Sequence, residues 1–324
     1  MQYGKKERTL QNFRKEHLCK FMKTAGIIAE YNPFHKGHEY QIRYTKEKLK
    51  ADYVIVAMSG DYVQRGTPAL ISKHARAEMA LRCGADLVLE MPVSVSTASA
   101  EAFAMGGVSL LDGLGVVDML CFGSESGDIS ALKELAEILV EEPEEYKKLL
   151  KSFLSEGLTF PAARSQALTE YFKNPRNFNG DDFDGVLTPL LNEVTQILNT
   201  PNNILGIEYC KALLRLNSRI IPHALLRKGS GYHDTDFSLL SDEKFPSASG
   251  IRNLMKKSEK AGQSADFSRL IPSASISGFL DSLEKGAWLS DSALDLPLHY
   301  KLLLESEETL KMYPELSDAL IRRI

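Results

Sequence analysis

Short apolar runs alternate with amphipathic stretches through the N-terminal part of the chain. Four of these runs are apolar on both faces, which is typical of buried parallel strands. The stretches between them have apolar residues at helical spacing. Strand and helix in alternation predict right-handed crossovers and an α/β fold with a doubly wound, Rossmann-like parallel sheet. The predicted strands are residues 25–30, 53–58, 86–91 and 116–122, and the predicted helices between and after them are residues 38–50, 72–85 and 97–114.

The remainder of the chain is mainly helical. Residues from about 128 to 171 are helical and acidic, which is typical of a solvated insertion. After a turn-rich segment, the pattern of PNNILGIEYCKALLRLN predicts another helix. The stretch SRIIPHALLR predicts one further strand. In SASGIRNLMKK, Ser247 or Ser249 is the candidate N-cap of a helix. These patterns divide the chain into a tail over residues 1–22, a main domain over 23–256 with a helical insertion at about 128–200, and a helical C-terminal region over 257–324.

Composition and length are those of an ordinary soluble protein. The 324 residues suggest one large domain or two, and 44% hydrophobic with 25% charged residues argues against a disordered or fibrous chain. No apolar run approaches the roughly 20 residues of a membrane helix, so we predict no membrane partner. The four cysteines form no CxxC pair, which argues against a zinc ribbon and favours a reducing cytoplasm. With a net charge of −4, a nucleic acid would need a local basic surface.

The N-terminal stretch MQYGKKERTLQNFRKEHLCKFMK is basic but lacks the apolar core of a signal peptide. Glu7 and Glu16 argue against a transit peptide, which is poor in acidic residues. We expect a frayed tail, with Met22 as an alternative start of translation because the first predicted strand follows it directly.

The turn after the first predicted strand, YNPFHKGH, is the strongest candidate for chemistry. In doubly wound sheets, ligands bind beyond the carboxyl ends of the strands, near the reversal of strand order. His35 and His38 lie there on either side of Gly37, directly before a predicted helix. Such a pair could serve packing and hydrogen bonding at a helix N-terminus. A zinc site is disfavoured because no third ligand follows at a suitable spacing.

A phosphate site is the third interpretation. Backbone N–H groups at a helix N-terminus favour an anion, and Gly37 would let a large planar group approach the backbone. Two imidazoles can donate hydrogen bonds to phosphate oxygens as negative charge builds up. The sequence has neither a GxxxxGK[ST] loop nor a suitably placed GxGxxG motif, so the histidines would replace the usual phosphate-binding loops. His35 and His38 are therefore the candidate catalytic residues.

The position of this HxGH string resembles that in the HIGH-type nucleotidyltransferases, which carry theirs at the same strand-to-helix turn. SASGIR resembles their second signature, so Ser249 and Arg252 are possible phosphate contacts. Longer motifs narrow the resemblance to the tRNA(Met) cytidine acetate ligase family, over most of the span from Thr24 to about Lys257. These motifs are GIIAEYNPFHKGHEYQI, MSGDYVQRGTPALISKHARAEMAL, GADLVLEMP, CFGSE, LTFPAARSQAL and PNNILGIEYCKALLR.

The resemblance implies an ATP-dependent ligase. It would activate acetate as acetyl-adenylate, release pyrophosphate and acetylate the wobble cytidine of elongator tRNA(Met), forming N4-acetylcytidine, with ATP and Mg²⁺ as cofactors. Either Asn202 or Asn203 could face the nucleotide and we choose Asn202, whereas Arg227 could instead be a surface charge. The implied ATP-binding residues are Ile28, Ala29, Glu30, Tyr31, Asn32, Pro33, Phe34, His35, Lys36, Gly37, His38, Glu39, Tyr40, Gln41, Gly123, Asn202 and Arg227.

Charged residues after the second predicted strand have two interpretations. Asp61 and Arg65 in SGDYVQRG are candidates for the rim of the pocket, although Asp61 is equally suited to a turn. Lys73, His74 and Arg76 are expected on a solvated helix face, with a contact to RNA phosphate as the alternative.

Two other functions are alternatives. One is a nucleotidyltransferase that adenylylates or cytidylylates a small phosphorylated metabolite, which the long segment 200–228 disfavours. The other is a binding protein that keeps the nucleotide fold without turnover. The chain departs from the family in the acidic segment NGDDFDG and in a C-terminal region that we expect to be incomplete. If the missing part helps to hold tRNA, the chain would activate acetate better than it modifies RNA.

Overall fold

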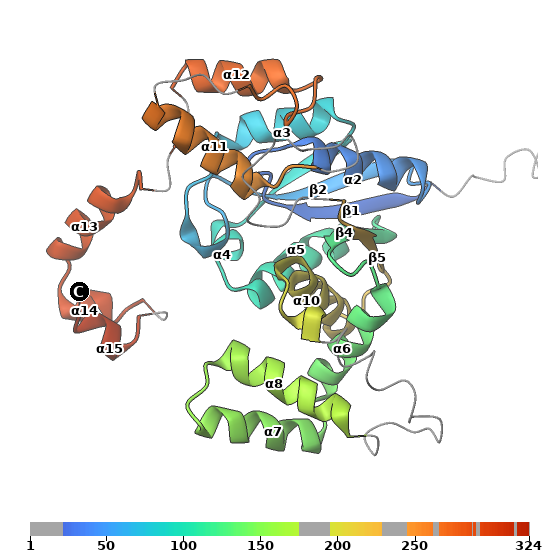
Figure 1. Ribbon diagram of the computed structural model, residues 1–324, viewed down its shortest axis with the longest axis vertical. Coiled ribbons are helices and arrows are strands. Elements are labelled where there is room, and N and C mark those ends of the chain that lie inside the picture. Colours follow the sequence, from blue (N-terminus) through green and yellow to red (C-terminus); the bar gives the residue numbers. More distant parts are fainter. Residues whose placement is uncertain are drawn as a thin grey trace, which may run out of the picture.

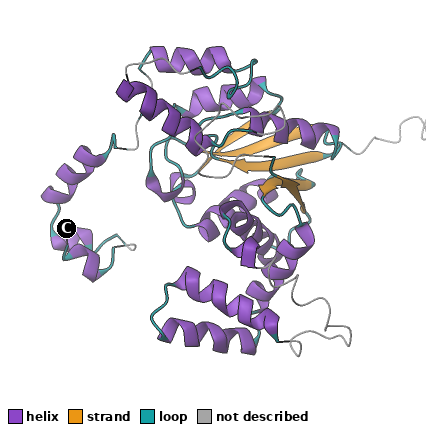
Figure 2. Ribbon diagram, in the orientation of Figure 1, coloured by secondary structure: helices purple, strands orange, loops and turns teal. Residues whose placement is uncertain are grey.

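Five parallel strands form the sheet at the centre of the fold (Figures 1 and 2). The computed structural model describes residues 22–174, 195–228, 245–261, 266–286, 288–289, 292–313 and 316–323. The strands are β1 (Thr24–Ala29), β2 (Tyr53–Ser59), β3 (Leu87–Met91), β4 (Met119–Ser124) and β5 (Ile221–Leu226). Their spatial order is β3-β2-β1-β4-β5, and every neighbouring pair is parallel. All five predicted strands are confirmed, although β4 begins at Met119 rather than at residue 116.

Alternate residues of the central strands enter two separate cores. In β2, Ile55 and Ala57 pack on one face of the sheet, whereas Val54, Val56 and Met58 pack on the other. Successive side chains of a strand point to opposite faces, so a strand that is covered on both faces must be apolar at every position. The continuous apolar runs of the sequence therefore have a direct physical cause, and the doubly wound fold class is confirmed.

Helices cover both faces of the sheet (Figure 1). The face with the second of these cores is covered by α2 (Lys36–Glu47), α3 (Lys73–Arg82), α11 (Ala248–Ala261) and α12 (Ile276–Glu284). The opposite face is covered by α5 (Ala100–Gly113), α6 (Ile129–Glu141) and α10 (Pro201–Arg215). Two short elements, η1 (Gln64–Gly66) and α4 (Val93–Ser96), lie in the loops after β2 and β3.

The predicted helical insertion contributes partly to the core. Leu132 and Leu135 of α6 are fully buried. Beyond that layer, α7 (Glu144–Ser155) and α8 (Phe160–Lys173) form a hairpin that adds Leu168 and Phe172 to the same core (Figure 1). The acidic segment NGDDFDG and the predicted tail up to residue 21 lie outside the described residues. The C-terminal region is helical as predicted, with α13 (Asp295–Leu304), α14 (Glu307–Leu310) and α15 (Asp318–Ile321).

The strand order places the candidate residues at the reversal of the sheet. From β1 the chain proceeds outward to β2 and β3, then crosses to β4 and β5 on the other side of β1. Helix α2 spans this switch point, where Gln41 Nε2 donates a hydrogen bond of 2.9 Å to the carbonyl of Cys121 in β4. Ligands of doubly wound sheets bind at this position. In the described part of the chain, no helix is long and apolar enough to cross a bilayer.

Candidate active site

His35 and His38 cap helix α2 reciprocally. His35 is the N-cap residue, with extended backbone (φ −146°, ψ 174°), and its Nδ1 accepts a hydrogen bond of 3.0 Å from the N–H of Gly37. In return, Nδ1 of His38 accepts a hydrogen bond of 3.2 Å from the N–H of His35. This is the geometry of a capping box, with imidazoles in place of hydroxyl and carboxylate groups. Because each Nδ1 is an acceptor, each neutral ring carries its hydrogen on Nε2.

Aromatic packing fixes the orientation of both imidazoles. The rings of His35 and His38 are stacked, with centroids 3.7 Å apart. Tyr31 and Phe34 are fully buried, and their ring centroids lie 4.7 and 5.5 Å from that of His38. Tyr31 has a left-handed backbone (φ 51°), which turns the chain sharply after β1 and brings these rings under α2. The imidazoles therefore have little rotational freedom.

Both imidazoles are neutral at pH 7. Burial lowers the pKa of His35 well below its ordinary value, with smaller contributions from its neighbours His38 and Arg227. Burial and, to a smaller extent, Arg227 lower the pKa of His38 to about 3. Among the described residues, neither Nε2 atom has a hydrogen-bond partner. The site therefore presents two neutral N–H donors to a ligand.

An open pocket of about 430 Å³ lies beside these rings. The walls come from the start of α2, the carboxyl end of β4, the loop that follows β5 and the segment before α11. The lining residues are His35, Gly37, His38, Tyr40, Gln41, Gly123, Leu225, Leu226, Arg227, Lys228, Phe245 and Pro246.

The backbone N–H groups at the start of α2 are already occupied. The N–H of Lys36 donates to the carbonyl of Leu270, that of Gly37 to His35 Nδ1, and that of His38 to the carbonyl of His35. These groups are satisfied within the protein in this arrangement, and the expectation that they hold an anion stays a prediction. At the start of α2, the Nε2–H groups of His35 and His38 are the donors that remain available to a ligand.

Two glycines make room for neighbouring side chains. A Cβ on Gly37 would lie 2.8 Å from Cε1 of His35, so glycine lets the imidazole fold back over the helix start. The position of the His35 ring thus explains why a glycine is needed at residue 37, in place of the expected approach of a planar ligand. Gly37 does line the pocket. A Cβ on Gly123 would lie 3.2 Å from Cγ of Arg227, which crosses the end of β4.

Arg227 is held in the pocket wall by the start of α10. Its Nη1 donates to Oδ1 of Asn202 at 3.2 Å, and Nδ2 of Asn202 donates to Oε1 of Glu125 at 2.5 Å. Glu125 also accepts from the N–H of Asn203 at 2.9 Å, so its carboxylate caps α10. Glu125 was missed in the sequence, although an acidic residue directly after CFGS was a usable signal.

Asn202 and Asn203 have different surroundings. Asn203 is buried, and its Oδ1 accepts from Oγ of Ser124 at 2.6 Å and from the N–H groups of Glu125 and Ser126. It therefore fixes the loop after β4, whereas Asn202 faces Arg227. Asn202 contacts a residue that lines the pocket but is not itself among the lining residues, so the choice of Asn202 stays a prediction.

Only part of the predicted ATP-binding span lines the pocket. Ile28, Tyr31 and Phe34 are core residues, which contradicts a ligand contact through their side chains. Asn32 is buried as well, and its Oδ1 accepts from the N–H of Leu70 at 2.7 Å. The residues of the span that line the pocket are His35, Gly37, His38, Tyr40 and Gln41.

The second signature lies against the histidine-bearing loop. Arg252 Nη1 donates to the carbonyl of Asn32 at 2.6 Å, and the hydroxyls of Ser247 and Ser249 lie 3.2 Å apart. Ser247 directly precedes α11, and its Oγ accepts from the N–H of Gly250 at 3.1 Å, so Ser247 is the N-cap. Ser249 and Arg252 are near the loop but are not among the residues that line the described pocket.

Sequence comparison agrees with this geometry. The family model described as HIGH Nucleotidyl Transferase matches residues 22–324. The chain is 41% identical to the tRNA(Met) cytidine acetate ligase of Clostridium novyi and 43% identical to that of Clostridium perfringens, in each case over 94% of this chain and 70% of the relative. This chain belongs to the tRNA(Met) cytidine acetate ligase family.

Solved structures of this family have the same fold. Thermotoga maritima TmcAL bound with alpha-thio ATP superposes with a TM-score of 0.76 at 37% identity, over 93% of this chain and 66% of that one. The apo form superposes with a TM-score of 0.79 at 38% identity, over 93% and 67%. This family member spans about two thirds of the length of these structures.

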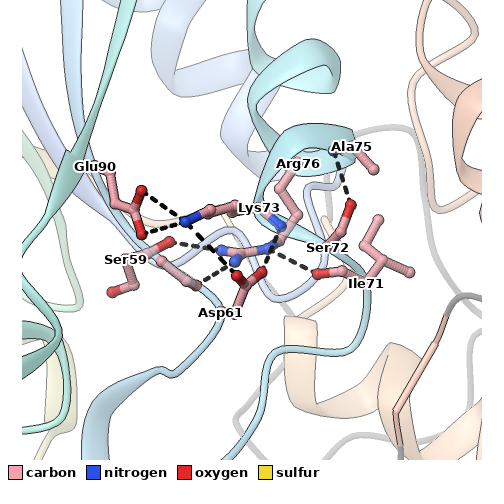
Figure 3. A network of polar contacts seen from close by, with 9 residues as sticks. Ser59, Asp61, Ile71, Ser72, Lys73, Ala75, Arg76 and Glu90 are labelled. Atoms are coloured by element: carbon pink, nitrogen blue, oxygen red, sulfur yellow. Dashed lines mark hydrogen bonds and ion pairs between the residues drawn. The ribbon is translucent and has the colours of Figure 1, made fainter.

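Asp61 belongs to a polar network on the opposite side of β1 (Figure 3). Its Oδ1 accepts from the N–H of Lys73 at 3.0 Å, and Lys73 Nζ contacts both carboxylate oxygens of Glu90 at 2.8 and 2.9 Å. Asp61 does not line the described pocket, so its prediction as a rim residue is not supported. Its carboxylate accepts from the first N–H of α3 rather than from the turn that was the alternative. The side chain of Arg65 lies outside the described residues.

Arg76 lies at the centre of that network and is fully buried (Figure 3). The prediction of a solvated helix face is therefore wrong for this residue. Its guanidinium donates to the carbonyls of Ile71 (3.1 Å), Glu30 (2.6 Å), Ser59 (3.0 Å) and Gly60. Burial lowers its pKa to about 10, so it stays charged at pH 7. Arg76 thus joins the carboxyl ends of β1 and β2.

Replacing Arg76 should destabilise the fold severely. Arg76→Met leaves four carbonyls without their donor, so we expect the free energy of unfolding to fall by about 3 kcal/mol or more. Urea denaturation measures this change. Arg76→Lys should lose less stability than Arg76→Met. As a control, His74→Met, at an exposed neighbouring position, should change the free energy of unfolding by less than about 0.5 kcal/mol. A loss in Arg76→Met no larger than that in His74→Met would contradict the role assigned to the guanidinium.

The stability should also depend on pH through the two imidazoles. Below an ordinary pKa of 6.5 the unfolded chain binds a proton at each histidine, whereas folded His38 stays neutral down to about pH 3. Unfolding takes up protons in this interval, so stability decreases as the pH falls, by about 1.4 kcal/mol per pH unit for each such group. Urea denaturation between pH 7.5 and 5 should show a shallower slope for His38→Asn, which keeps the acceptor but does not titrate. Equal slopes would mean that His38 is protonated in the folded protein.

Proposed function

We propose that the chain activates acetate with ATP and transfers the acetyl group to the wobble cytidine of elongator tRNA(Met). The observation that carries this proposal is the pair of neutral Nε2–H donors beside an open pocket at the switch point of the sheet. Membership of the tRNA(Met) cytidine acetate ligase family supports the choice of substrates. We place the reaction in the cytoplasm, where tRNA is modified.

In the first step, an acetate oxygen attacks the α-phosphorus of ATP and the bond to the pyrophosphate oxygen breaks. Acetate is already ionised at pH 7, so no general base is required. Negative charge increases on the phosphate oxygens in the transition state. We assign the Nε2–H groups of His35 and His38, with the guanidinium of Arg227, to the stabilisation of that charge.

Mg²⁺ would neutralise the charge of the departing pyrophosphate. In proteins that bind nucleotides this ion is held largely by phosphate oxygens and water rather than by a dedicated set of side chains. The described residues contain no group of three His, Cys, Asp or Glu side chains arranged for a metal ion. The ion would therefore arrive with the nucleotide.

In the second step, the exocyclic amine of cytidine attacks the acetyl carbonyl carbon of the adenylate. A C–N bond forms, the bond between the acetyl group and AMP breaks, and the amine loses a proton to solvent. This step requires an amine held in position and a site that excludes competing water.

An assay with radiolabelled acetate, ATP and Mg²⁺ tests the proposal, with and without elongator tRNA(Met). We expect labelled acetyl-adenylate without RNA and labelled cytidine with RNA. Label in neither product would overturn the proposal. Transfer of AMP to a phosphorylated metabolite would instead favour the nucleotidyltransferase alternative.

Two substitutions of His38 separate its capping role from its role toward the nucleotide. The side-chain oxygen of His38→Asn can replace Nδ1, whereas the amide of His38→Gln can replace the Nε2–H donor. We expect His38→Asn to keep near-wild-type stability and to lose about a hundredfold in acetyl-adenylate formation, because one transition-state donor is removed. His38→Gln should keep more activity and lose about 1 kcal/mol of stability with the cap. An unchanged rate in His38→Asn would make the imidazole purely structural.

A further inference from the structure

Two cations share one aromatic ring at the mouth of the pocket. The guanidinium carbon of Arg43, on α2, lies 5.9 Å from the ring centroid of Tyr40, and Nζ of Lys228, after β5, lies 5.6 Å from it. These distances are those of cation–π contacts. Arg43 and Lys228 are both exposed, so their charges remain accessible to a partner.

Among the described residues, the Tyr40 ring and not a carboxylate is the neighbour that these two cations share. Arg43 and Lys228 form no ion pair with any described residue, and Glu39 and Glu47, one helical turn on either side of Arg43, do not pair with it. Several other exposed cations of the described residues, such as Lys48, Lys148 and Arg269, also form no ion pair, whereas others are neutralised by carboxylates. The paired examples are Lys46–Asp86, Lys73–Glu90, Arg82–Glu78, Lys173–Glu170, Arg215–Glu101, Lys285–Asp281 and Lys311–Glu307.

Aromatic rings accompany the two cations. Phe245 stacks on Tyr40 with centroids 5.0 Å apart, and Tyr44 lies one turn further along α2 at 6.2 Å. Tyr40, Lys228 and Phe245 line the pocket, whereas Arg43 and Tyr44 lie outside its lining. Tyr40 and Tyr44 are half-buried against the core, and Arg43 beside them carries positive charge from the pocket mouth to the surface of α2.

We propose that this surface, made of Tyr40, Arg43, Tyr44 and Lys228, binds the backbone of the single-stranded RNA segment that carries the acceptor cytidine. The inference rests on the proposed function. Single-stranded RNA is held by cations that contact phosphates and by aromatic side chains on which bases stack. In a chain of net charge −4, a local basic surface is needed for such a partner.

The position of the surface matches the requirement of the second step. The cytidine amine must enter the pocket to reach the adenylate, so the neighbouring nucleotides must cross its mouth. Lys228 lines that mouth, and Arg43 continues the positive charge beyond it. Arg43 is outside the lining, which separates it from the triphosphate that we assign to His35, His38 and Arg227.

The test compares Arg43→Gln with Arg219→Gln. Arg219 is also exposed, but it precedes β5 and therefore lies at the amino ends of the strands, opposite the pocket. Binding of elongator tRNA(Met) and of its anticodon stem-loop is measured by fluorescence anisotropy at several salt concentrations. For Arg43→Gln we expect roughly fivefold weaker binding and a log–log salt slope shallower by about 0.7, the value for one lost contact to a single strand. Arg219→Gln should bind as the wild type does.

A second measurement excludes a role of Arg43 toward ATP. Acetyl-adenylate formation without RNA should have wild-type KM for ATP and wild-type kcat in Arg43→Gln. A raised KM for ATP would overturn the proposal, as would RNA binding equal to that of Arg219→Gln. Lys228→Gln, tested for RNA binding alone, should lower the affinity and the salt slope in the same way, and unchanged binding would remove Lys228 from the surface.

The binding measurement does not depend on turnover, so the two proposals fail separately. If the wild type forms no acetyl-adenylate while Arg43→Gln still weakens RNA binding, the proposed function falls and the RNA surface stands. If the wild type acetylates RNA and both arginine variants bind equally, the proposed function stands and the RNA surface falls.

Discussion

The site depends on the reciprocal hydrogen bonds between two imidazoles and the backbone at the start of α2. A serine or aspartate could accept from the same N–H groups, but neither has an N–H donor held at a fixed distance on the far side of a rigid ring. An imidazole has two nitrogens on opposite parts of a rigid ring. In His35 and His38, Nδ1 is used by the helix, and this bond determines that the hydrogen is on Nε2. The interaction that starts the helix therefore also determines what the pocket presents to a ligand.

The loops on either side of β1 are held by opposite kinds of polar group. Beyond a parallel strand, backbone carbonyls and N–H groups lose their ladder partners and must be satisfied in another way. At β1 and β2, the guanidinium of Arg76 donates to the carbonyls. At β4, the amide oxygen of Asn203 accepts from the N–H groups, and Glu125 caps α10 in return. Because both sets of contacts are buried or half-buried, the loops that follow β1, β2 and β4 are held in place at the carboxyl edge of the sheet.

Some of these features could be predicted from the sequence and others could not. The strands follow from runs such as YVIVAM, because a strand buried on both faces must be apolar throughout, and their order of appearance places His35 at the switch point. Arg76 was misjudged because a charged residue at helical spacing usually faces solvent, and only the folded chain brings four carbonyls around it. The motif YNPFHKGH was predicted as a contiguous nucleotide contact, yet Tyr31 and Phe34 turn inward. Within a tight turn, neighbouring side chains point in opposite directions, and a sequence motif does not record which of them enter the core.

Neutral donors suit the charge changes of adenylate formation better than additional cations would. An ammonium group binds a triphosphate strongly in the ground state, whereas catalysis requires interactions that strengthen only in the transition state. At His35 and His38, burial and the charge of Arg227 lower the pKa and keep the rings neutral. Negative charge near an imidazole acts in the opposite direction and raises its pKa. As charge increases on the phosphate oxygens, the Nε2–H groups would hold their protons more firmly and their hydrogen bonds would strengthen with the charge that they stabilise. Arg227 thus adds to the effect of burial on the pKa of the imidazoles, and in the proposed reaction it would also attract the anion directly.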